Sequence, residues 1–130
     1  MTLDENITQY LEDNGVGTEG TDLFISDLPG TTTNAVMVKL TGGEEPNKYV
    51  DVKRLTVQIM VRNSNPQTAK TTAYSIYDLL HNKDDDFVLE TGGVDVMRSE
   101  AISFPSMILK DEEGRTYYST NYLFTVRGTD

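Results

Sequence analysis

The sequence contains no cysteine and no tryptophan, and only one histidine, His81, in 130 residues. Without cysteine there is no disulfide, no thiolate nucleophile and no cysteine-based zinc site. Metal centres built on several imidazoles are excluded too, and a Ser–His–Asp arrangement has only His81 to use. His81 falls at the polar end of a predicted helix, where histidines often interact with terminal carbonyls. We therefore interpret it as structural.

The sequence is also poor in long apolar runs and in basic residues. No apolar run approaches the roughly 20 residues that span a bilayer, and the N-terminus lacks signal-peptide features. We therefore expect a cytosolic protein without membrane contacts. Lysine and arginine number 11 against 21 acids, a net charge of −10. Because nucleic-acid binding relies on cations, we expect no specific binding of DNA or RNA. The acidity is explained by solubility, or by a surface along which DNA must pass without sticking.

No motif in the sequence predicts a catalytic or metal centre. The run Asp84–Asp86 lacks the alternating acids and central glycine of a calcium loop, so we predict a solvated loop. Gly42-Gly43 and Gly92-Gly93 belong to no phosphate-binding pattern and are interpreted as turns. A tyrosine-rich stretch near the C-terminus lacks a basic stripe, so we assign it to the core and to cross-strand pairing. We predict no enzyme activity and no cofactor.

Two helices are predicted from caps and apolar spacing. Thr2 and Glu5 form a capping box ahead of an apolar face, and Asn14-Gly15 supplies a left-handed stop. A second, stronger helix is capped by Asn65, has Pro66 in its first turn and ends near His81-Asn82. Its apolar stripe begins with small residues and ends with large ones: Ala69, Ala73, Ile76, Tyr77 and Leu80. This order indicates that the start of the helix approaches a sheet closely.

Between and after the helices the pattern changes to strands. Strands are predicted at 23–25, 35–40, 55–62, 87–89, 94–97, 106–110 and 115–127, with Asp111 to Gly114 as a hairpin loop between the last two. In the final strand the residues of one face are Tyr118, Thr120, Tyr122, Phe124 and Val126. The order is helix, three strands, helix, antiparallel strands. We predict one α+β domain over residues 1–130, with a mostly antiparallel sheet and both helices on one face.

The order and lengths of these segments resemble a known family. The carrying stretches are Ile7-Thr-Gln-Tyr-Leu, Gly20-Thr-Asp-Leu-Phe-Ile, Thr56-Val-Gln-Ile-Met-Val-Arg and Ala73-Tyr-Ser-Ile-Tyr-Asp-Leu-Leu-His, with a closing Tyr122-Leu-Phe-Thr-Val. Together they are similar to the tail-terminator, or minor capsid, proteins of tailed phages. The resemblance implies a ring of six copies that caps the tail tube, ends its polymerisation and joins the tail to head or neck proteins. It also implies a virion location, assembly in the host cytoplasm, and DNA passing through the centre.

The resemblance carries over no catalytic residue and does not fix the interface. We predict subunit contacts in two loops, at Glu44, Glu45, Asn47, Lys48 and Tyr49 and at Asp111, Glu112, Glu113 and Arg115. The alternatives are a neck, stopper or head-completion protein of a tailed virus, or a non-viral adaptor that stays monomeric. An enzyme would have to work with carboxylates and tyrosines alone.

Overall fold

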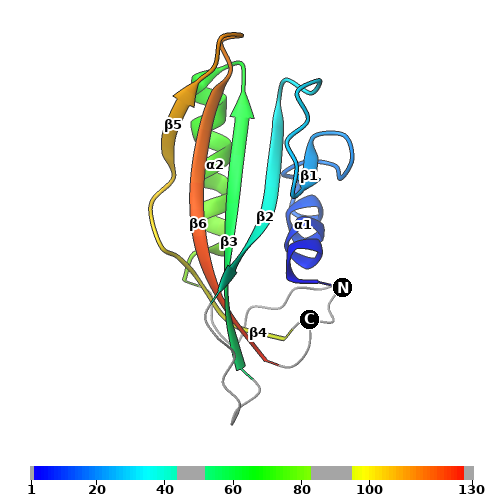
Figure 1. Ribbon diagram of the computed structural model, residues 1–130, viewed down its shortest axis with the longest axis vertical. Helices are drawn as coiled ribbons and strands as arrows, with labels where there is room; N and C mark the ends of the chain where they lie inside the picture. Colours follow the sequence, from blue (N-terminus) through cyan, green and yellow to red (C-terminus); the bar gives the residue numbers. More distant parts are fainter. Residues whose placement is uncertain (1, 44–51, 83–94, 128–130) are drawn as a thin grey trace.

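The computed structural model describes residues 2–43, 52–82 and 95–127 (Figure 1). Its elements follow the predicted order: α1 (Leu3–Asp13), β1 (Leu23–Ile25), β2 (Ala35–Gly43), β3 (Val52–Asn63), α2 (Pro66–Leu80), β4 (Asp95–Ala101), β5 (Ser106–Lys110) and β6 (Thr116–Arg127). The predicted α+β class is therefore confirmed. The predicted strand at 87–89, the acidic run Asp84–Asp86 and the turn at Gly92-Gly93 lie outside the described residues.

Both helices begin at the predicted caps. The Glu5 carboxylate accepts a hydrogen bond from the backbone N–H of Thr2 at 2.9 Å, and this bond holds the pKa of Glu5 below its usual value. Asn65 Oδ1 accepts from the N–H groups of Gln67 and Thr68, at 2.9 and 3.2 Å. These contacts satisfy amides that have no partner inside the helix, so both start points follow from local chemistry.

The sheet of the described residues has the order β1-β2-β3-β6-β4, with β5 also paired to β6. β1 runs parallel to β2, and every other pair is antiparallel. β4 and β5 share one side of β6: β4 pairs with Tyr122–Arg127 and β5 with Thr116–Ser119. The segment 102–105 links them and donates one bond, from Ile102 N–H to Asn121 O at 2.8 Å. One edge of the sheet is therefore a composite of β4, this segment and β5.

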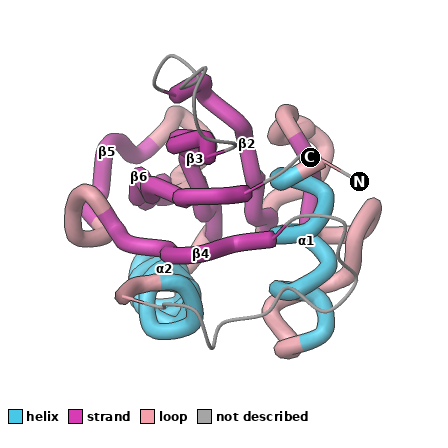
Figure 2. Tube along the Cα trace, turned by 90° about the horizontal axis from the view of Figure 1, so that it is seen from below, coloured by secondary structure: helices cyan, strands magenta, loops and turns pink. Residues whose placement is uncertain are grey.

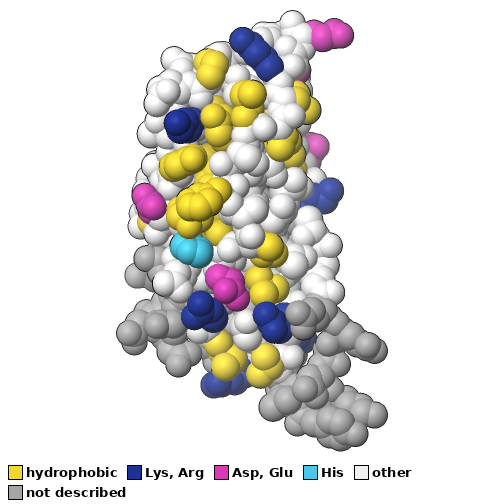
Figure 3. Space-filling view, turned by 90° about the vertical axis from the view of Figure 1, so that its left-hand side faces the viewer, with side chains coloured by type: hydrophobic (Ala, Val, Ile, Leu, Met, Phe, Trp, Pro, Cys, Tyr) yellow, Lys and Arg dark blue, Asp and Glu magenta, His cyan; other side chains and the backbone are white. Residues whose placement is uncertain are grey.

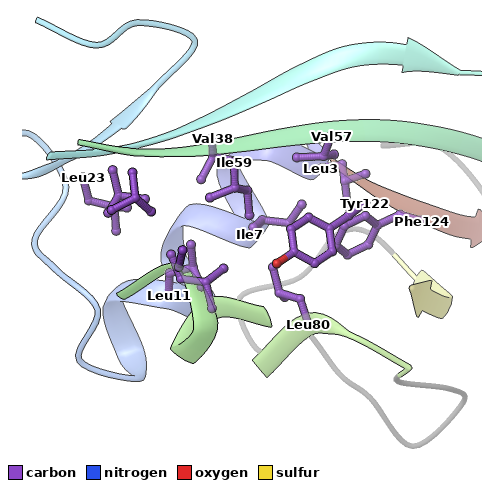
Figure 4. Close-up of a cluster of buried hydrophobic side chains, with 14 of the residues drawn as sticks. Leu3, Ile7, Leu11, Leu23, Val38, Val57, Ile59, Leu80, Tyr122 and Phe124 are labelled. Carbon is purple, nitrogen blue, oxygen red and sulfur yellow. The ribbon is translucent and has the colours of Figure 1, made fainter. Parts of the chain in front are cut away.

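One face of the sheet carries the core, and Figure 2 shows both helices lying against that face. Cross-strand partners such as Val38 and Ile59 point toward the helices together. Tyr122 and Phe124 of β6 are fully buried against residues that include Ile7 and Leu80 (Figure 4). Burial also raises the pKa of the Tyr122 phenol, because the phenolate cannot be hydrated there. The predicted inward face of the last strand is confirmed, and so is the placement of both helices.

Two details differ from the sequence predictions, and a third, the burial of Arg62, was not predicted. The strand predicted at 94–97 continues to Ala101, because pairing with β6 extends to Tyr122. Gly42-Gly43 is part of β2 and not a turn; a Cβ on Gly43 would lie 2.2 Å from Arg54 O, so only glycine fits that close approach. Arg62 alternates onto the face opposite the core yet is only 2% exposed, because the β1–β2 connection covers it.

Candidate subunit interface

The predicted contact residues divide into two groups. Glu44, Glu45, Asn47, Lys48 and Tyr49 lie outside the described residues. Asp111, Glu112, Glu113 and Arg115 form the tip of the β5–β6 hairpin, where the sequence placed them. Their part in subunit contacts stays a prediction, and the structure defines what each side chain does within the chain.

Asp111 and Arg115 hold the hairpin tip in shape. Asp111 Oδ2 accepts from Arg115 Nε at 2.7 Å and from the Tyr117 hydroxyl at 3.1 Å, and Oδ1 accepts from the Arg115 N–H at 2.9 Å. Desolvation alone would raise the pKa of Asp111, but these hydrogen bonds from Arg115 and Tyr117 together lower it. The bond to Asp111 in turn raises the pKa of Arg115. Both side chains are engaged inside the tip, whereas Glu112 and Glu113 are exposed.

The tip is also tied to the loop between β1 and β2. Arg115 Nη1 donates to Gly30 O at 3.0 Å. The buried guanidinium of Arg62 donates to the carbonyl oxygens of Pro29, Thr32 and Thr33. Its Nη1 lies 3.5 Å from the Tyr117 hydroxyl, which links Arg62 to Asp111. Arginine suits this position because its fork of fixed donors reaches several carbonyls at once. We call this set the polar clamp: Arg62, Asp111, Arg115, Tyr117 and the carbonyls they bind.

A second feature, which the sequence analysis did not select, is an exposed apolar surface on the composite sheet edge. Its members are large apolar side chains from the end of β4 through β5 and from the adjacent flank of α2: Tyr74, Ile102, Phe104, Met107, Ile108 and Leu109. Ile102 is 58% exposed and Phe104 67%. Figure 3 shows hydrophobic side chains gathered along this side of the molecule. We call this set the apolar edge.

Aromatic stacking builds the centre of the apolar edge. The Phe104 ring stacks on Tyr77 of α2 with centroids 5.2 Å apart, and Tyr77 stacks on His81 at 4.6 Å. His81 Nδ1 accepts a hydrogen bond from the Ala101 N–H at 3.0 Å. The side chain of His81 therefore accepts a hydrogen bond from a backbone amide of β4, while its backbone N–H donates to the helix carbonyl of Tyr77 at 2.8 Å. The hydrogen bond from Ala101 to His81 fixes the end of β4 against α2, where Phe104 packs on Tyr77.

The apolar edge has two properties of a recognition surface. Monomeric proteins rarely expose contiguous apolar patches of this kind, and such patches commonly mark interaction sites. A sheet edge also presents unpaired backbone groups that favour association. The sequence signal was present: Met107-Ile108-Leu109 is a run of three apolar residues in a short strand that should alternate. The alternation fails there because pairing with β6 is irregular between Met107 and Leu109.

The described residues offer little to other kinds of chemistry. They contain no group of three or more His, Asp or Glu side chains placed to hold a metal ion. Within the same ranges, neither helix is long and apolar enough to cross a membrane. His81 is used in stacking and in one backbone hydrogen bond. An exposed apolar surface on a sheet edge, beside the polar clamp, is typical of proteins that assemble with other proteins.

Comparison with known proteins gives the same class. The sequence matches the family of bacteriophage tail terminator proteins over residues 10–127. This chain therefore belongs to the bacteriophage tail terminator family, and it is a structural protein of the phage virion. The fold is similar to a chain in the virion of the native gene transfer agent (GTA) particle, with a TM-score of 0.69 and 17% sequence identity. That match covers 97% of this chain and 95% of the other. No curated protein matches the sequence.

Proposed function

We propose that copies of this chain form a ring, of six by the resemblance described above, on the end of the phage tail tube. The ring stops polymerisation of the tube and presents a surface to a neck or head-completion protein. The single observation that carries the proposal is the apolar edge of a family member whose core is complete within one chain. Such a chain folds alone, and its remaining exposed apolar surface is available for assembly.

The other parts of the proposal concern what the ring does not do. DNA passes through its centre without specific binding, in keeping with a net charge of −10 that opposes phosphate contacts. The protein acts in the tail or neck of the virion after assembly in the host cytoplasm, with no catalysis and no cofactor. The predicted loop contacts at 44–49 and at the hairpin tip add to the apolar edge.

The test is to mix the purified protein with the tube protein of the same virus. Light scattering gives the molar mass of this protein, and electron microscopy gives the length of the tubes. We expect a mass of about six copies, with or without the tube as template, and tubes that shorten as the protein is added. A matched variant, Phe104→Ser, should leave the fold intact and lose both effects, because Phe104 is largely exposed.

The outcomes separate the alternatives. A ring that binds tube ends and leaves tube length unchanged would favour a neck, stopper or head-completion protein of the same particle. A protein that stays monomeric and leaves the tubes unchanged would exclude the terminator function and favour an adaptor.

A further inference from the structure

A groove lies on the other flank of α2, between that helix and the end of α1. It has a volume of about 470 Å³ and is lined by Asn14, Gly15, Val16, Thr71, Thr72, Ser75, Asp78 and Leu79. Val16 and Leu79 give it apolar walls, and short hydroxyl side chains leave it open. Its size falls in the range, roughly 300–1,000 Å³, of pockets that enclose small organic groups. It can therefore accept one or two protruding side chains.

The groove and the apolar edge point in different directions. At 100° per residue, Tyr77 on the edge side of α2 lies roughly 140–160° around the helix axis from Thr72, Ser75 and Leu79 in the groove, and Tyr74 lies between Tyr77 and the groove residue Asp78. One copy can therefore contact two neighbours at once, one through each surface. A contact between two different surfaces repeats from copy to copy and closes into a ring when its rotation divides a full turn, whereas a contact between identical surfaces ends at a pair.

Charge distinguishes the two surfaces. Asp78 lines the groove, and Glu12 and Asp13 lie on the last turn of α1 beside it. Residues 2–38 as a whole carry seven acids and no lysine or arginine: Asp4, Glu5, Glu12, Asp13, Glu19, Asp22 and Asp27. The apolar edge is instead flanked by Lys70, whose ammonium lies 5.8 Å from the centroid of the Tyr74 ring, and by Lys110 at the end of β5. The nearest acids that the structure describes on this side, Glu100 and Asp111, are paired with Arg98 and Arg115. Contact between the apolar edge of one copy and the groove of another brings lysines close to acids. Contact between two grooves would bring acids close to acids.

We infer that Ile102 and Phe104 on the apolar edge of one copy insert into the α1–α2 groove of the next copy. This inference rests on the self-assembly in the proposed function and specifies the two surfaces that perform it. Phe104 is the anchor, because Tyr77 supports its ring and 67% of its surface remains exposed. Large aromatic side chains that become buried at the centre of an interface commonly act as its anchors. The hydroxyl side chains of the groove and the lysines of the edge form the polar rim.

Disulfide cross-linking tests the pairing directly, because the chain has no cysteine of its own. One variant carries Ser103→Cys, between the two inserting residues, and another carries Ser75→Cys in the groove; both positions are exposed. We expect a mixture of the two to give cross-linked dimers under mild oxidation, with neither variant cross-linking alone. A chain with both substitutions should give a ladder that ends at the size of the ring. The matched control pairs Ser103→Cys with Ser64→Cys, an exposed serine outside the groove, and should give no product.

Each outcome is decisive. If Ser103→Cys cross-links to itself, the edge meets its own copy across a twofold axis and the inference is wrong. If the protein forms rings and limits tube length but Ser103→Cys and Ser75→Cys do not cross-link, the inference fails while the proposed function stands. If the protein stays monomeric with the tube protein present, leaves tube length unchanged and gives no cross-link, both fail. Cross-links equal to those of the Ser64→Cys control also overturn the inference.

Discussion

At the scale of single residues, Arg62 shows how a charged side chain is buried to fix a loop. Its guanidinium is enclosed by the carbonyls of Pro29, Thr32 and Thr33 and reaches Asp111 through the Tyr117 hydroxyl. The ring of Tyr117 also lies 5.7 Å from the guanidinium carbon. Burial of a charge is costly unless each donor finds a partner, and here the loop carbonyls provide them. The β1–β2 loop is thereby attached to the far end of β3.

We expect Arg62→Met to lower the free energy of unfolding by about 2–4 kcal/mol. The substitution keeps an apolar stem but removes every donor, so the loop carbonyls lose charged hydrogen bonds. Arg62→Lys should give an intermediate loss, because an ammonium cannot reach all three carbonyls at once. Urea unfolding measures both. The matched control is Arg98→Met, on a half-exposed side chain, where we expect a change of about 0.5 kcal/mol or less. Equal effects at the two positions would show that the polar clamp does not stabilise the fold.

We expect the ionised Asp111 side chain to make the stability of the fold depend on pH in the acid range. Its pKa is lowered in the folded state by hydrogen bonds from Arg115 and Tyr117. A lowered pKa means that the contribution is fully present above the unfolded pKa of about 4 and is lost as pH falls through the folded value. We expect Asp111→Asn to be less stable than the wild type at pH 7 and to lose less stability between about pH 4 and pH 2. Thermal unfolding between about pH 4 and pH 2 measures this change in stability with pH. Glu112→Gln, on the same hairpin tip, is the control. Parallel curves for wild type and Asp111→Asn would contradict the assignment.

At the scale of elements, β5 differs from every other strand. All five of its residues are exposed, and none belongs to the hydrophobic core cluster. It is held by pairing with β6 and by the polar clamp at its tip. A strand attached in this way opens at lower free energy than strands that contribute to the core. We therefore expect the stability of β5 to increase when another subunit covers the apolar edge.

Hydrogen exchange should show this difference between strands. In the Phe104→Ser variant, we expect amides of Ser106–Lys110 to exchange at least tenfold faster than core amides of β3 such as Val57 to Val61. In the assembled wild type the β5 amides should slow while those of β3 stay unchanged, because assembly covers one edge and leaves the core alone. Mass spectrometry of exchanged peptides measures both. Equal protection of β5 in the two samples would show that the assembly contact lies elsewhere.

Elements whose signals are local were predictable from the sequence. The caps at Thr2 and Asn65, the stripe of α2 and the alternation in β6 each depend on neighbours within a turn or two, and all four are confirmed. The parallel pairing of β1 with β2, the burial of Arg62 and the stacking of Phe104 on Tyr77 join residues 13 to 29 positions apart in the sequence. Contacts between residues so far apart leave no periodic pattern in the sequence, so the sequence alone does not predict the apolar edge.

At the scale of the whole molecule, the core does not include the surface proposed for assembly. The core cluster draws residues from both helices and from β1, β2, β3, β4 and β6 of one chain, with no contribution from β5. The surface proposed for assembly is thus not needed to complete the core. This contrasts with obligate oligomers, whose folded monomer is unstable and whose stability depends on concentration throughout.

We therefore expect the unfolding midpoint of the Phe104→Ser variant to be independent of protein concentration. The midpoint of the wild type should match it at low concentration and rise once assembly begins, because binding between folded copies stabilises them by mass action. Urea titrations at about 0.5 to 50 µM protein, followed by circular dichroism, measure the difference.

If the midpoints of the wild type and the variant rise equally with concentration, assembly does not use the apolar edge. If the variant is unfolded at every concentration, the edge is part of the core and the separation of folding from assembly is wrong. The expected result instead describes a subunit that is folded as a monomer in solution and associates with other copies in a separate step.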